Sequence, residues 1–470
     1  MQEYFGPPLA ANNPFELSQD VRANENDVFG RNSAEELCTW TWCNPEEHLF
    51  SSIGLNYLFF ESVGPGSSGR TSEPIHYTPD LELKPKIREI GEGLRARLST
   101  GTSIETISSS IELIFADSNV YQLVTAYFDN WHCHNPMLHR PSFKPSSTFA
   151  PLLSAVMLVG AIYSTDEHAR AARNCFDAAE EYVFTHESFR ELYDPHSGSG
   201  VQPLQAAYII CILRQWDSHR GSRRRVRLQL YPSIVSAARS LGLTKLRHMA
   251  SKKSDHAPSY DDWKEFIKTE EKIRLMAWIF LVDTSHAIFY GTPPRLTVSE
   301  MTGCLPCDDQ LFMAHGPESF HDLSTLATSS KLCSVSRGVS LFFAQEWTRG
   351  SIAEFGQLNY LDFFLLVHAL HQIIFSNKAT YSLRFTKSAI ECALERWEDL
   401  WNTLITDKVE MDSYKVGFFK YANDYWWLAK LLVRTESPHF EPKKMGEDFD
   451  HDSTAEVNSL LKRFASIALS

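Results

Sequence analysis

The 470-residue chain is 43% hydrophobic, so it can bury a large core, and by length it could hold two or three domains. Its net charge of −13 argues against a broad nucleic-acid-binding surface, because such surfaces are usually basic, and leaves room only for a small DNA-binding module. Scattered cysteines, no secretory signal and no apolar run of membrane-spanning length predict a soluble protein of the nucleus or cytosol.

Residues 1–80 are rich in Asn, Pro, Ser and Gly, and we expect them to be largely irregular. Within them, residues 35–63 interleave acids with large apolar residues, a composition typical of segments that fold on a partner, including activation segments. Docking of these aromatic residues onto the chain's own helical body is the favoured alternative. Residues 64–69 formally fit G-x-G-x-x-G, but two prolines follow and no helix, so we interpret them as a turn.

The stretch from Ala126 to Ser164 is the predicted centre of the fold. Aromatic residues at helical spacing lead into a segment interrupted by prolines, which cannot continue a helix. From Pro151 to Tyr163 the chain is apolar on every face, a pattern that predicts a buried central helix.

Helical spacing continues through the rest of the chain and predicts an all-α fold, one large multi-helix body after the irregular N-terminal segment. Its core is expected in residues 84–313, with residues 314–470 as a C-terminal helical part of the same body. After residue 315 four amphipathic runs are expected at 329–347, 360–375, 380–404 and 414–433, then a polar linker at 438–452 and a last helix at 454–469. Four tryptophans are the expected core anchors of this part: Trp397, Trp401, Trp426 and Trp427.

A dense basic cluster surrounds Arg223, Arg224 and Arg225, with Arg220 and Arg227 on either side. The cluster predicts either a nuclear import signal or an exposed helix start, and we hold the two at even odds. It lacks the aromatic or glycine-rich frame that base readout would need, so a DNA site here is disfavoured.

Four sequence elements occur in a fixed order over about 190 residues, and the first of them lies between His132 and Ser164. The second is the small-residue helix end S-A-A-R-S-L-G-L at 236–243, and the third is a charged-to-apolar helix over 270–283 with Trp278 and a terminal Asp283, followed by G-T-P-P. The fourth is Leu305-Pro306-Cys307-Asp308. The first element comprises His132, Pro136, His139, Arg140, Pro141, Phe143, Leu152, Leu153, Gly160, Ala161, Tyr163 and Ser164.

This order resembles the regulatory domain, or middle homology region, of fungal-specific transcription factors. Thr284 and Ser285 stand where the family often has Asp-Arg, and the loop reads G-T-P-P rather than G-R-P. The resemblance implies an all-helical, non-enzymatic regulator in the nucleus that controls a metabolic or secondary-metabolite pathway with the transcription machinery, sometimes by sensing a small-molecule effector.

Family members usually carry a zinc-containing DNA-binding module before this domain, whereas Cys38 and Cys43 are the only cysteines here before Cys133. Either such a module, with zinc as its cofactor, lies outside this sequence and contacts DNA, or the protein reaches DNA through a partner regulator. The alternatives are a DNA-free co-regulator, a cytosolic small-molecule-binding helical protein and, least favoured, an all-α metalloenzyme.

Candidate metal ligands are incomplete. Cys304 and Cys307 form half of a zinc site, and the cluster of His132, Cys133, His134 and His139 flanks a proline turn, so at both places we expect structural residues. No catalytic motif is found, and no cofactor is expected in this chain. Asp283 ends an apolar helix face and therefore needs a cation or backbone donors, with Arg295 or Arg274 as the expected partner.

Overall fold

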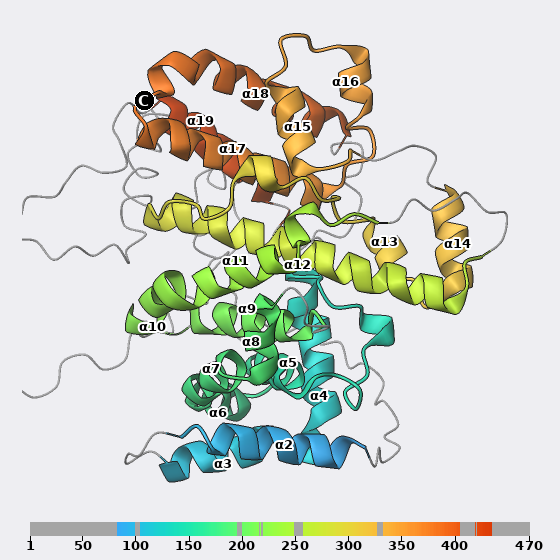
Figure 1. Cartoon of the computed structure of the whole chain (residues 1–470), viewed down its shortest axis with the longest axis vertical. Coiled ribbons are helices and arrows are strands. Elements are labelled where there is room, and N and C mark those ends of the chain that lie inside the picture. Colours follow the sequence, from blue (N-terminus) through green and yellow to red (C-terminus); the bar gives the residue numbers. More distant parts are fainter. Residues whose placement is uncertain are drawn as a thin grey trace, which may run out of the picture. The chain divides into compact units, whose positions relative to one another are not determined.

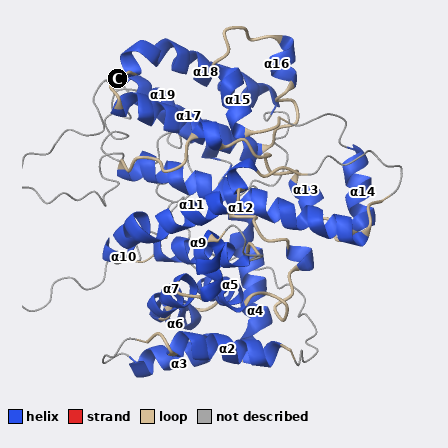
Figure 2. Ribbon diagram, viewed as in Figure 1, coloured by secondary structure: helices blue, strands red, loops and turns tan. Residues whose placement is uncertain are grey.

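The computed structural model describes residues 82–98, 104–194, 200–215, 217, 220–248, 257–326, 332–404, 419 and 421–434. All regular structure in these ranges is helical, which confirms the all-α prediction (Figure 2). None of the helices described is both long and apolar enough to cross a membrane. The predictions for 1–80, including the segments 35–63 and 64–69, and those for 438–452 and 454–469 concern residues outside this part of the chain.

Helix α5 (Ala150–Ile162) is buried on every side, as predicted, but it is the centre of the first half of the chain rather than of the whole fold. Every residue from Ala150 to Ala161 is buried, and α5 packs against α4 (Val120–Ala126), α6 (Asp166–Asn174) and α9 (Gln202–Gln215). Gly160 permits the contact with α4, because a Cβ there would lie 1.8 Å from the carbonyl oxygen of Leu123. Helices α2 (Leu83–Arg95) and α3 (Ile104–Ile114) complete this region.

The helical spacing over 166–193 corresponds to three short helices, α6, α7 (Phe176–Phe184) and α8 (Glu187–Arg190). The break between α7 and α8 is caused by side chains at the break itself. The Thr185 hydroxyl donates to the carbonyl oxygen of Glu181 at 2.6 Å, and the His186 ring accepts the Ser188 amide, which starts α8.

Helix α12 (Tyr260–Tyr290) is the longest helix described, with 31 residues. The Ser259 side chain caps its start, and Gly291 ends it with φ +60°, a left-handed conformation that glycine adopts without a Cβ clash. In Figure 1 it runs between α11 (Tyr231–Ser240) and α17 (Tyr360–Ala379), and it contacts both. All residues from Ile273 to Phe289 are buried, so α12 connects the two halves of the core.

The predicted runs after residue 315 appear as α15 (Val335–Phe342), α17, α18 (Leu383–Leu404) and α19 (Ala422–Arg434). Helices α13 (Asp309–Phe312) and α14 (Pro317–Leu326) precede these runs in the sequence, and the short α16 (Arg349–Ala353) lies between α15 and α17. The first run is much shorter than predicted, because Ser334 caps the helix start. One hydrophobic cluster extends from Leu83 to Val433 and includes residues on both sides of position 313.

The four predicted tryptophan anchors differ in burial, according to the face of the helix on which each lies. Trp397 and Trp426 are buried, and their indole N–H groups donate to the carbonyl oxygens of Phe363 and Leu394 at 3.1 and 2.8 Å. Trp401 is partly buried and stacks on Trp397. Trp427 is 39% exposed, so the prediction that it is a core anchor is wrong. It follows buried Trp426 by one residue and therefore points about 100° away around the helix.

Candidate regulatory core around Arg274

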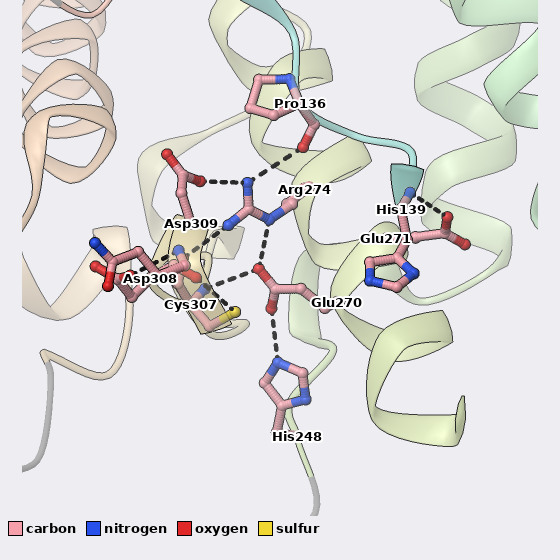
Figure 3. A network of polar contacts seen from close by, with 10 residues as sticks. Pro136, His139, His248, Glu270, Glu271, Arg274, Cys307, Asp308 and Asp309 are labelled. Atoms are coloured by element: carbon pink, nitrogen blue, oxygen red, sulfur yellow. Dashed lines mark hydrogen bonds and ion pairs between the residues drawn. The ribbon is translucent and has the colours of Figure 1, made fainter. Parts of the chain in front are cut away.

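Residues far apart in the sequence meet around one buried arginine on α12 (Figure 3). We call this set the Arg274 network: the side chains of Arg274, Glu270, Asp309 and His248 with the backbone of Pro136 and Cys307. It joins the first, third and fourth sequence elements, which lie up to 138 residues from Arg274 along the chain.

The Arg274 guanidinium is fully buried, and all three of its nitrogens donate hydrogen bonds. It reaches the carboxylates of Glu270 and Asp309, each at 2.7 Å, and two carbonyl oxygens, that of Pro136 at 3.2 Å and that of Cys307 at 2.8 Å. Burial alone would lower its pKa, but the charges of Asp309 and Glu270 raise it, so the group stays charged. A lysine could not make this set of bonds, because its ammonium lacks the planar fork.

Glu270 is the buried carboxylate that neutralises this arginine. One oxygen accepts from Arg274 and from the backbone N–H of Cys307 at 2.8 Å, and the other lies 2.8 Å from Nε2 of His248. Burial raises the pKa of Glu270, but the hydrogen bond with His248 and the charge of Arg274 outweigh it and lower the pKa. The carboxylate therefore remains ionised and ties the chain before α12 to the Leu305–Cys307 element.

His139 is held beside this network by Glu271, the next residue of α12. Its backbone N–H donates to Glu271 at 2.8 Å, its Nδ1 lies 2.8 Å from the Ser142 hydroxyl, and its Nε2 lies 3.2 Å from the Ala314 carbonyl oxygen. Burial lowers the pKa of His139 to about 4, so the ring is neutral at pH 7. Burial raises the pKa of Glu271 to about 7, against the lowering effect of the His139 amide.

Asp283 anchors the loop that follows α12. One of its carboxylate oxygens accepts the backbone N–H groups of Arg295 at 2.8 Å and Leu296 at 2.7 Å. The prediction that Arg274 pairs with Asp283 is wrong, because Glu270 and Asp309 bind that guanidinium. The other expected partner, Arg295, binds Asp283 through its backbone N–H. The predicted alternative, that backbone groups donate to Asp283, is therefore confirmed.

Replacing Asp283 with asparagine is expected to change how stability depends on pH. Burial raises the pKa of Asp283 to about 6, against lowering by the Leu296 and Arg295 amides. Between its ordinary pKa and about 6 the folded state holds the proton that the unfolded state has lost, so stability falls as pH rises. From about pH 4 to about pH 7 wild type should lose at most about 3 kcal/mol relative to Asp283→Asn in urea unfolding.

The exposed Asp261 at the start of α12 is the matched control for this experiment. Asp261→Asn should follow the wild-type pH dependence. An equal pH slope in wild type and Asp283→Asn would contradict the assignment.

The second sequence element holds the same loop from the other side. The Arg239 guanidinium donates to both carboxylate oxygens of Glu300, at 2.9 and 2.8 Å, and to the Arg295 carbonyl oxygen at 2.6 Å. Gly242 follows α11 with φ +67° and turns the chain toward Thr244, whose carbonyl oxygen accepts two loop amides. The second and third elements therefore bind the chain segment between Gly291 and Asp309, which contains the fourth, and the first element is joined to it through Arg274.

The structure also places Arg140, Pro141, Phe143 and Tyr163 of the first element. Arg140 donates to Asp129 at 2.7 Å on the surface, and Pro141 lies in the first turn of a short 3-10 helix, Arg140–Ser142. The ring of Phe143 meets Phe128 edge-on at 5.2 Å, and Tyr163 ends α5.

In the later elements Trp278 is buried 5.6 Å from the Phe419 ring, and Leu305 and Pro306 are buried beside the network. Cys307 contributes its backbone to the network, and its thiol donates to the Asp308 carbonyl oxygen at 3.4 Å; neither Cys307 nor Cys304 forms a disulfide. Within the ranges that the structure describes, no three metal-ligand side chains form a group that could hold a metal ion.

The predicted import residues lie in and beside α10 (Arg220–Arg225). Arg225 pairs with Glu180 at 2.8 Å, Arg223 donates to the Asp217 carbonyl oxygen at 2.9 Å, and Arg224 is exposed. They are remote in sequence from the Arg274 network, and the import prediction stays a prediction.

Sequence reasoning missed His248, Glu271 and Asp309. Glu270 and Arg274 have the i, i+4 spacing of a helical ion pair, and that signal could have marked the network. Their other partners come from separate elements, which helical spacing does not reveal. The donors and acceptors of the network satisfy one another, so its role is to hold three chain segments in one arrangement.

The sequence of this chain is similar to those of known fungal transcription factors. A family model described as fungal specific transcription factor domain matches residues 124–399. Transcription factor verF of Penicillium polonicum is 28% identical over 416 residues, 77% of this chain and 55% of that protein. The nicotinate catabolism cluster-specific transcription factor of Emericella nidulans is 23% identical over 258 residues, 53% of this chain and 27% of that protein. No solved structure matches.

This chain spans about half the length of the first of these relatives and about a quarter of the second. The family match covers more than half of the 470 residues and contains all four sequence elements. The chain therefore belongs to the fungal specific transcription factor domain family.

Proposed function

We propose that this chain is the regulatory part of a nuclear transcription regulator that controls a specific metabolic or secondary-metabolite pathway in a fungus. The observation that carries the proposal is the family match over residues 124–399, which contains the Arg274 network. Both relatives are named as transcription factors, and one is named for a catabolic gene cluster. Regulation rather than catalysis is the proposed activity.

The proposed mechanism is a shift between two helical packings, biased by an effector or a partner. The Arg274 network supports it, because three segments from different parts of the chain share one set of bonds and must change together. A ligand that prefers one arrangement of the loop between Gly291 and Asp309 would alter the first element through Pro136. Contact with DNA would be direct, through a zinc module outside this sequence, or indirect, through a partner regulator.

Genome-wide chromatin occupancy of the tagged protein in its own host tests this proposal. We expect discrete peaks near the genes of one pathway. Peaks lost on deletion of a partner regulator would identify a recruited co-regulator, and peaks that persist without any partner would identify direct DNA binding. A protein that stays cytosolic without peaks under all growth conditions would contradict the proposal and favour a cytosolic small-molecule-binding protein.

A further inference from the structure

Helix α10 is a basic segment that contributes no apolar side chain to the core. Its sequence is Arg-Gly-Ser-Arg-Arg-Arg, and none of residues 221–225 is buried. Its C-terminal end continues into the helical turn Val226–Leu230, but residues 221–225 have no apolar side chain to pack on the helical body. Its attachment to the rest of the protein therefore depends on polar contacts.

Glu180 on α7 is the centre of these contacts. Its side chain is 4% exposed, and its two oxygens bind Arg225 and Arg214, each at 2.8 Å. Arg214, at the end of α9 and 6% exposed, also pairs with Asp177 at 2.7 Å and Asp217 at 3.0 Å. Burial raises the pKa of Glu180 above its ordinary value, although the charges of Arg214 and Arg225 act in the opposite direction.

Two further bonds complete the attachment of α10. The Ser222 hydroxyl accepts from Arg214 at 3.1 Å, and Arg223 donates to the Asp217 carbonyl oxygen at 2.9 Å. Ser222, Arg223 and Arg225 are thus all joined to the helical body by hydrogen bonds or ion pairs. A competing partner can reach Arg225, whose side chain is 54% exposed, and Glu180 keeps its second cation, Arg214, when Arg225 leaves.

The chain directly after α10 forms a distorted helical turn, at which α10 can bend away from the helical body. Residues Val226–Leu230 form a π-helical turn, a rare geometry, and Pro232 in the following helix start has no N–H to donate. Arg227 lies within this turn, buried, with its guanidinium 4.0 Å from the centre of the Tyr290 ring. Val226 before it is fully buried in the core, so opening of α10 would stop at Val226 and leave the core intact.

We propose that Arg223–Arg225 are a nuclear import signal that the Glu180 pair holds closed. A receptor that reads a linear basic signal binds it as an extended segment through acidic groups, so it competes with Glu180 for Arg225 and requires α10 to unwind. Import then depends on how often α10 leaves α7. This inference rests on the proposed nuclear function, and it adds the signal, its contact and the element that opens.

The test follows the full chain fused to two fluorescent proteins, which slow passive entry into the nucleus. We expect the triple change Arg223→Ala, Arg224→Ala, Arg225→Ala to lower the nuclear-to-cytosolic ratio at least fivefold. Glu180→Gln weakens the hold on Arg225 and should raise the ratio at least twofold. Glu181→Gln, an exposed neighbour on α7, is the matched control and should change nothing.

A second readout uses the purified full chain. Trypsin cleaves extended segments after arginine, so Glu180→Gln should accelerate cleavage at Arg223–Arg225 several-fold while Glu181→Gln does not. Circular dichroism shows whether the variant keeps its helices. If Glu180→Gln unfolds the protein, Asp217→Asn, which removes a charge beside Arg214 and leaves Glu180 in place, replaces it in both measurements.

Two outcomes would overturn this inference. Nuclear accumulation that survives the triple alanine change would place the signal elsewhere, while chromatin occupancy could still support the regulatory function. Faster cleavage without a higher nuclear ratio would show that α10 opens but does not control import. A nuclear protein with the expected arginine dependence but no chromatin peaks would instead contradict the proposed function alone.

Discussion

Replacing Arg274 with methionine is expected to lower the free energy of unfolding by about 3–5 kcal/mol. Methionine can fill much of the same apolar space beside Phe312 but leaves the fully buried Glu270 without its cation. It also removes the donors to two carbonyl oxygens, those of Pro136 and Cys307. Removing one member of a buried ion pair costs far more than the pair contributes, because the remaining charge stays out of water. Urea unfolding followed by far-UV circular dichroism measures the change.

The control for this prediction is Lys268→Met on the same helix. Lys268 is 65% exposed, and its pair with Glu265 at 3.7 Å is a surface contact, so its replacement should change stability by less than about 0.5 kcal/mol. The double variant Glu270→Gln with Arg274→Met removes both charges and should recover part of the loss. A double variant as unstable as the sum of its two parents would show that the two charges do not interact.

The elements that follow from local pattern were predictable. Helix α5 is apolar on every side over more than three turns, and burial on every side is the only environment that suits such a helix. Asp283 was predicted to need donors because it follows an apolar run, and this need is confirmed, although the prediction that Asp283 ends the helix is wrong because α12 continues to Tyr290. In both cases the physical demand is visible within a few residues of sequence.

The partners of the Arg274 network were not predictable in the same way. Arg274 binds Asp309, which is 35 residues away, and Pro136, which is 138 residues away. Several other acids lie at comparable separations, and only the packing of α12 against the loops decides among them. Helical periodicity likewise could not decide between the adjacent Trp426 and Trp427, since each satisfies a plausible inward face until the neighbouring α18 is in place.

Gly160→Ala is expected to be the most disruptive single-methyl change in the first half of the fold. A Cβ on Gly160 would lie 1.8 Å from the Leu123 carbonyl oxygen and 2.6 Å from its carbonyl carbon, far inside van der Waals contact. Both atoms belong to the backbone of α4, so no side chain can turn aside and the two helices must move apart. Separation opens space along a fully buried helix, and overpacking of this kind costs typically about 1–3 kcal/mol. We expect about 3 kcal/mol here, because backbone has to shift.

The same substitution in α16 provides the opposite expectation. A Cβ on Gly350 would meet its nearest neighbour, the Thr348 hydroxyl oxygen, at 3.5 Å, which is ordinary contact. Alanine also loses less backbone entropy than glycine when a helix forms, so Gly350→Ala should be neutral or stabilising by up to about 1 kcal/mol. Comparison of Gly160→Ala with Gly350→Ala distinguishes the effect of close helix packing on stability from that of helix propensity, since the chemical change is identical and only the environment differs. Equal effects of the two substitutions in urea unfolding would mean that α4 and α5 do not touch at Gly160, and the predicted central position of α5 would lose its main support.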